Sequence, residues 1–88
     1  MPDHLLTFEL SEEKDQLLIH GDVKGLRFLI EELERLLAHT KDGQFNHEHL
    51  KTREWGGDEL SSESQGGVVL NHVEIYCWNM ISDSAGAA

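Results

Sequence analysis

His47 and His49 carry the most direct chemical signal in this sequence. Because successive side chains of a β-strand point to opposite faces, this i, i+2 spacing puts both imidazoles on one face. With His20 or His72 from a neighbouring strand, they could supply three nitrogen ligands for zinc. Six histidines in 88 residues also produce such pairs by chance. We therefore assign the pair to a partner-binding surface and predict no metal and no cofactor, keeping a histidine-based metal protein as the alternative.

The residues that could act as nucleophiles form no catalytic pattern. Cys77, the single cysteine, falls in a strand expected to be buried, and Ser61 and Ser62 fall in a loop expected to be flexible. The pairs Gly56-Gly57 and Gly66-Gly67 lack the following Lys-Ser/Thr of a phosphate-binding loop. We therefore expect a protein that is not an enzyme.

Trp55 stands in a charged, glycine-rimmed segment that suits a protein interface. Arg53, Glu54, Asp58 and Glu59 surround it. Tryptophan is enriched at interface hot spots, and the carboxylates would steer a cationic partner. The alternative is that Trp55 folds back over the sheet or the helix. The predicted partner-binding residues are Glu54, Trp55, Asp58, Glu59, His47 and His49.

The charge of the chain indicates what kind of partner it binds. There are 17 acidic and 7 basic residues, a formal charge of -10, and no lysine or arginine follows Arg53. Such a balance argues against nucleic acid and anionic membranes and favours a protein with a basic surface. The single cysteine suits a reducing compartment, so we expect a cytoplasmic protein.

Hydrophobic periodicity predicts the elements that hold these residues. Alternating patterns predict strands at 6–10, 17–20, 44–52 and 68–78. Between the second and third strands, the spacing i, i+3, i+4 predicts an amphipathic helix over 23–41, with Asp22 as its N-cap. Its apolar stripe contains Leu26, Leu29, Ile30, Leu33, Leu36 and Leu37. Residues 53–67 read as an irregular connection.

This order predicts an α+β fold in two layers. A four-stranded, mainly antiparallel sheet of order ββαββ would pack one face on the helix. Residues 1–80 would form this single domain, and residues 81–88 would be a disordered tail. The uncovered face would display His20, His47, His49 and Lys51, with His72, Glu74, Tyr76 and Trp78 from the last strand.

Several short runs resemble the immunity protein 32 family of bacterial polymorphic toxin systems. They are His20-Gly21-Asp22, the helix with Gly25-Leu26, Leu29 and Leu33, His47-Glu48-His49-Leu50, Trp55-Gly56 with Leu60, and Val73-Glu74-Ile75-Tyr76. The resemblance covers about residues 16 to 78. It implies a small cytoplasmic α+β protein that binds and neutralises a cognate toxin, with no catalytic motif to transfer.

The combined hypothesis is stoichiometric occlusion of a toxin. The anionic loop and the open sheet face would cover a basic active site, such as that of a nuclease, by resembling its polyanionic substrate. A homodimer is compatible with this function. The other alternative is a structural subunit that pairs through its sheet.

Overall fold

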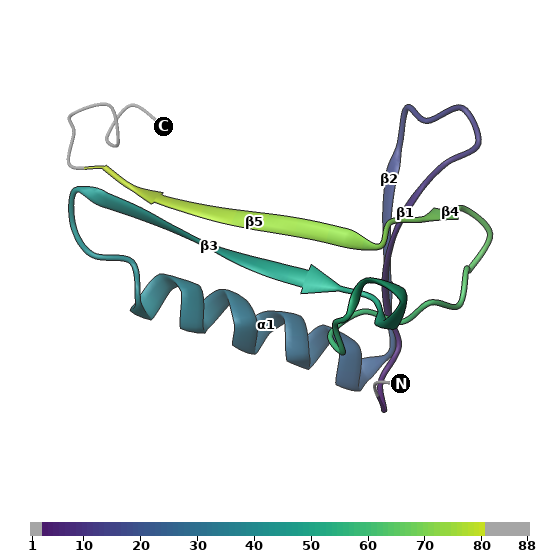
Figure 1. Ribbon diagram of the computed structural model, residues 1–88, viewed down its shortest axis with the longest axis horizontal. Helices are drawn as coiled ribbons and strands as arrows, with labels where there is room; N and C mark the ends of the chain where they lie inside the picture. Colours follow the sequence, from purple (N-terminus) through teal and green to yellow (C-terminus); the bar gives the residue numbers. More distant parts are fainter. Residues whose placement is uncertain (1–2, 81–88) are drawn as a thin grey trace.

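Two small antiparallel sheets and one α-helix make up the protein, and the computed structural model describes residues 3–80 (Figure 1). The elements in chain order are β1 (Leu6–Leu10), β2 (Leu17–Gly21), α1 (Val23–Ala38), β3 (Gln44–Lys51), the 3-10 turn η1 (Arg53–Trp55), β4 (Val68–Val69) and β5 (His72–Asn79). The predicted α+β class and the antiparallel pairing are confirmed. The predicted tail at 81–88 lies outside the described residues.

The first sheet has the order β2-β1-β4, with β1 in the centre. β1 and β2 form an antiparallel hairpin, in register from Leu6 opposite Gly21 to Leu10 opposite Leu17. β4 adds two residue pairs on the other edge of β1, starting at Glu9 opposite Val69. Both edges of β1 are therefore paired, which explains why most of this strand is buried.

The second sheet is the long ribbon of β3 and β5. All eight residues of β3 pair with β5, from Gln44 opposite Asn79 to Lys51 opposite His72. In Figure 1 this ribbon extends away from β1 and β2, and α1 lies along β3. The ribbon thus forms one layer and the helix the other.

The strands divide between two sheets, whereas one four-stranded sheet was expected. The predicted strand 68–78 is interrupted at Leu70 and Asn71. The Leu70 N–H donates to Phe8 O at 2.8 Å, and Asn71 O accepts from the Thr52 N–H at 3.0 Å. The first half of the segment therefore pairs with β1 and the second half with β3, so a turn between the halves separates the sheets.

The core lies where the two sheets meet the start of the helix. Its buried members are Leu6, Phe8, Leu50 and Leu60, and Phe28, Leu29, Leu70, Val73 and Ile75 pack against them. Leu60 comes from the segment 53–67 and is fully buried. Its N–H donates to Lys51 O at 3.1 Å. The irregular connection is thus anchored in the core.

A buried carboxylate holds the second half of that connection. Glu9 of β1 is fully buried on the face opposite the core residues. It accepts hydrogen bonds from Thr7 Oγ1 at 2.6 Å, from the Gly67 N–H at 2.8 Å and from the Gln65 N–H at 3.0 Å. Because the segment containing Gln65 and Gly67 is bound in this way, it covers the outer face of the first sheet.

The helix begins as predicted and ends earlier. The Asp22 carboxylate accepts from the Gly25 N–H at 2.7 Å, so the N-cap is confirmed. α1 ends at Ala38, where His39 is the C-cap. Gly43 has φ 77° and donates its N–H to Asn79 O at 2.6 Å, so it belongs to the turn that opens β3. Within residues 3–80, no helix has the length and hydrophobicity needed to cross a membrane.

The helix is rotated relative to the packing that its apolar stripe predicts. Its buried residues are Gly25, Glu32 and Leu36. Glu32 reaches Arg35 Nη2 at 2.6 Å, which compensates part of the cost of burying its charge. Burial raises the pKa of the Glu32 carboxyl, and the Arg35 guanidinium opposes this increase. As a result, much of the stripe that was expected to cover the sheet faces solvent.

Replacing Gly25 by alanine is expected to lower the free energy of unfolding by about 2 kcal/mol. A Cβ atom there would overlap the carbonyl oxygen of Leu5, so the strand entry or the helix must shift. Alanine would otherwise favour the helix by about 1 kcal/mol. Urea unfolding of Gly25→Ala and of the exposed control Lys24→Ala shows whether each substitution raises or lowers the free energy of unfolding. Stabilisation by Gly25→Ala would show that the close approach is not required.

Candidate functional site: an aromatic and histidine face

The two faces of the β3–β5 ribbon differ in composition. One face carries Leu50, Val73 and Ile75 into the core. The opposite face, with the adjoining Trp55, gathers aromatic and histidine rings, and we call it the aromatic face: Phe45, His47, His49, Trp55, His72, Tyr76 and Trp78. The register brings the strands' contributions together, because Phe45 lies opposite Trp78 and His47 opposite Tyr76.

The rings form one continuous row. At its far end, Phe45 stacks on Trp78 with ring centroids 4.7 Å apart. Tyr76 lies 5.8 Å from Trp78 and 5.1 Å from His47, in stacked orientations. All these separations fall in the range of favourable aromatic pairs. The side chains therefore support one another in a defined surface.

The other half of the row consists mainly of histidines. His47 meets His49 edge to face at 4.8 Å, and His49 stacks on His72 at 5.0 Å. Trp55 closes the row, with its ring 5.9 Å from that of His72. Three residues predicted from the sequence, His47, His49 and Trp55, thus lie on one face.

The large rings of this face are well exposed. Trp78 is 62% exposed, Trp55 57%, Phe45 53% and Tyr76 46%. An exposed patch of large apolar side chains marks an interaction surface more often than a solvated one. Tryptophan and tyrosine are also the residues most enriched at interface hot spots.

Backbone hydrogen bonds fix Trp55 at the end of the ribbon. η1 follows β3 directly, and the Trp55 N–H donates to Thr52 O at 3.0 Å. Thr52 is itself fully buried. Gly56 then takes φ 85°, a left-handed conformation that glycine adopts without steric cost. The turn therefore directs the chain back toward the core while Trp55 remains exposed.

The predicted carboxylates lie in the loop beside Trp55, in different environments. Glu54 is exposed and accepts from Ser62 Oγ at 2.5 Å, and this hydrogen bond lowers the pKa of its carboxyl. Glu59 is half-buried and accepts from the Lys51 N–H at 3.0 Å, so it also holds the loop to β3. Asp58 is exposed. Acidic groups thus border one end of the aromatic face.

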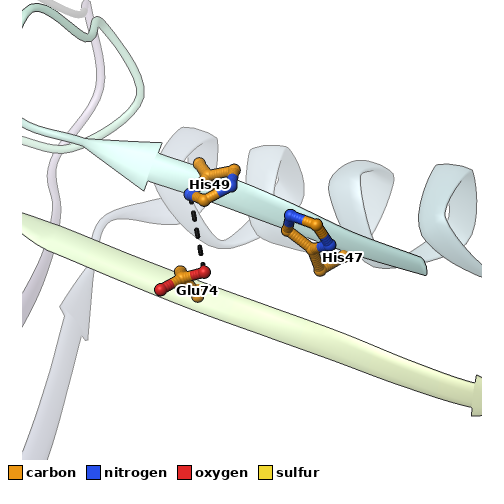
Figure 2. A group of neighbouring side chains, drawn as sticks. All are labelled: His47, His49 and Glu74. Carbon is orange, nitrogen blue, oxygen red and sulfur yellow. Dashed lines mark ion pairs between the residues drawn. The ribbon is translucent and has the colours of Figure 1, made fainter. Parts of the chain in front are cut away.

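Glu74 brings a carboxylate into the middle of the face, and it was not among the predicted site residues. Figure 2 shows Glu74 on β5 facing His49 on β3, with His47 next along that strand. Glu74 Oε1 lies 3.8 Å from His49 Nδ1 and accepts from the Tyr76 hydroxyl at 3.1 Å. This hydrogen bond raises the pKa of Tyr76. The sequence had placed Glu74 on the uncovered face. The register of β3 against β5, which the pattern of one strand does not contain, puts it directly opposite His49.

A second exposed apolar surface lies on the helix. The side chains of Val23, Leu26, Ile30, Leu33 and Leu37 are between 38% and 71% exposed. Leu17 and Ile19 of β2 are also exposed. Sequence reasoning missed this surface, because it assigned the stripe to the contact with the sheet.

Comparison with known proteins gives one match. A family model described as immunity protein 32 matches residues 16–73. Searches of curated proteins and of solved structures returned no match. The matched segment contains α1, β3 and the Trp55 turn, and it ends before Tyr76 and Trp78.

Proposed function

Because this chain belongs to the immunity protein 32 family, we propose that it neutralises its cognate toxin by covering the toxin's active site with the aromatic face. Membership of the family implies toxin neutralisation, and immunity proteins of this kind are typically inhibitors without enzymatic activity. The observation that carries the proposal is the continuous row of exposed rings on β3, β5 and η1. We place this action in the cytoplasm.

The residue types of the face suit tight binding. Tyrosine and tryptophan bury a large area with few rotatable bonds, so little side-chain entropy is lost when a partner docks. The stacking of Phe45 on Trp78 and of His47 on Tyr76 restricts these rings further. A preorganised surface of this kind loses less free energy to ordering on association.

The negative charge of this chain supports a toxin with a basic active site as its target. With the net charge of -10 and with Glu54, Asp58 and Glu74 at or beside the face, the surface would attract a cationic active site. Nucleases need such sites for phosphate groups, so we propose that the toxin acts on a polyanionic substrate. The carboxylates would then occupy the positions of phosphates.

Reversing the loop charges is expected to slow association with the toxin. The double variant Glu54→Lys, Asp58→Lys should lower the association rate constant by about tenfold at low salt, with little difference at about 1 M salt, where charges are screened. The variant Glu12→Lys, Glu13→Lys changes the net charge equally in the distant β1–β2 turn. Stopped-flow mixing measures both. Equal slowing by the two variants would show that net charge acts without a local site.

Retention of the toxin from a lysate of the source organism tests the function itself. Immobilised protein should retain a toxin chain that mass spectrometry identifies at low salt, and less of it at high salt. Expression of the recovered toxin domain should stop cell growth, and co-expression of this protein should restore it. Growth that stays arrested despite a stable complex would contradict neutralisation.

A further inference from the structure

We propose that the centre of the aromatic face binds one Zn²⁺ ion, with His47, His49 and Glu74 as ligands and His72 as a further nitrogen donor. One ligand atom from each of the first three residues lies within 4.8 Å of the other two. His72 Nε2 lies 2.7 Å from His49 Nδ1. The site therefore combines imidazole and carboxylate ligands, both of which zinc accepts.

The backbone already places the ligands at suitable positions. His49 lies directly opposite Glu74 in the β3–β5 ladder, and His47 follows on the same face. Around a tetrahedral zinc ion with bonds of about 2.0 to 2.1 Å, ligand atoms lie about 3.3 Å apart. The 3.8 Å between His49 Nδ1 and Glu74 Oε1 is close to that separation. Small rotations of these side chains would bring the ligand atoms to the required separation without any change in the strands.

Neighbouring groups support a metal-binding state. The Tyr76 hydroxyl donates to Glu74 Oε1 at 3.1 Å and orients the carboxylate, as outer hydrogen bonds do in metal sites. The 2.7 Å contact between His49 Nδ1 and His72 Nε2 requires a proton between the two nitrogens. Zinc binding would displace this proton, and the two rings would move apart to about 3.3 Å so that both nitrogens bind the ion. His49 and Glu74 are exposed, so the ion can reach the site from solvent. The proposal does not depend on toxin binding.

Titration of untagged protein with zinc, measured by isothermal titration calorimetry, tests this site. We expect one Zn²⁺ per chain, removable by EDTA, and at least about tenfold weaker binding in the variant His47→Gln, His49→Gln. His39→Gln removes a histidine at the helix C-cap and should bind zinc unchanged. Circular dichroism confirms that the variants fold. Absence of zinc binding, or equal binding by the double variant, would overturn the proposal. Toxin retention by metal-free protein would be unaffected by either result, so the two proposals are tested separately.

A second inference rests on the exposed helix surface. We infer that a second copy of this chain packs antiparallel on the seam Val23, Leu26, Ile30, Leu33 and Leu37. These residues alternate spacings of three and four, the a and d pattern of a coiled-coil contact. Their 38% to 71% exposure contrasts with the buried Glu32 on the sheet side of the same helix. Within residues 3–80 this seam stays exposed on a formed helix, which suits a helical partner.

The charges beside the seam favour a copy of the same chain. Arg27 and Glu34 each follow a d position, so both occupy e positions on one flank of the seam. In an antiparallel pair related by a two-fold axis, e positions face the e positions of the partner. Arg27 of each copy would then face Glu34 of the other. The sequence of one helix therefore supplies both halves of two ion pairs.

Sedimentation equilibrium over a range of concentrations tests this pairing. We expect a monomer–dimer equilibrium in which Ile30→Glu leaves only monomer. Arg27→Glu should raise the dissociation constant by about tenfold, since two attractive pairs become repulsive. Arg27→Glu combined with Glu34→Arg should restore it. A monomer at all concentrations, or a dimer indifferent to Ile30→Glu, would overturn the inference.

Discussion

Replacing Trp78 by alanine is expected to weaken toxin binding by about 100-fold, close to 3 kcal/mol. Trp78 has the largest exposure of the rings in the aromatic face, at 62%, and it stacks on both Phe45 and Tyr76. Its removal would delete one large contact surface and leave its two neighbours less ordered. Surface plasmon resonance with the recovered toxin domain measures the dissociation constant.

The matched control is an exposed apolar residue away from the face. Leu17→Ala in β2 removes a side chain that is 54% exposed, at the opposite sheet. It should leave toxin affinity within about twofold of the unmodified protein, since residues outside an interface contribute little. A loss of affinity in Leu17→Ala with none in Trp78→Ala would place the toxin on the other side of the molecule.

Replacing Glu9 by alanine is expected to lower the free energy of unfolding by about 3 kcal/mol. The substitution removes a fully buried carboxylate and leaves the N–H groups of Gln65 and Gly67 without their acceptor. The segment that covers the first sheet would then detach. Urea unfolding measures the loss, with exposed Glu13→Ala as the control. An unchanged transition would show that the loop does not depend on Glu9.

The same carboxylate gives stability a defined pH dependence. Burial raises the pKa of Glu9, but hydrogen bonds from Thr7 and from the Gly67 and Gln65 N–H groups outweigh burial, so the pKa lies below its ordinary value of 4.5. Its contribution is therefore complete above that value and is lost as the pH falls through the lower pKa of the folded state. Glu9→Gln should flatten this dependence in unfolding curves taken from about pH 7 to about pH 3.

Local sequence patterns predicted the elements well, because each element follows one simple period. The alternation in 44–52 placed His47 and His49 on one face and Leu50 on the other, as the structure confirms. The N-cap at Asp22 was equally local. The division into two sheets could not be foreseen, because it depends on Leu70 and Asn71 bonding to two different strands.

The rotation of the helix also depends on tertiary packing. Its apolar stripe predicted burial of Ile30 and Leu37, yet the close approach at Gly25 turns the helix so that Glu32 is buried instead. The burial of Glu9 also depends on tertiary packing, since the alternation of β1 alone predicts that this charged residue faces solvent. Its carboxylate can be buried because the segment 61–67 adds the Gln65 and Gly67 N–H donors to the hydrogen bond from the Thr7 hydroxyl.

The candidate site was predicted in its parts but not in its arrangement. The sequence named His47, His49 and Trp55 as partner-binding residues from separate arguments, and the structure brings them into one row. His72 and Tyr76 were expected on the uncovered sheet face and lie there. His72 contacts His49 and Trp55, and Tyr76 extends the row from His47. The register of β5 against β3 decides which rings meet. Register depends on the whole ribbon, which explains why no single motif indicated the complete face.

An NMR titration with the recovered toxin domain tests the central claim most directly. The chain's two tryptophans, Trp55 and Trp78, lie at opposite ends of the aromatic face, so their indole N–H signals report on its whole length. We predict that both signals, with the amides of β3 and β5, shift as the toxin is added. Unchanged indole signals, with shifts confined to α1 and β2, would contradict the assignment of the aromatic face as the toxin-binding surface.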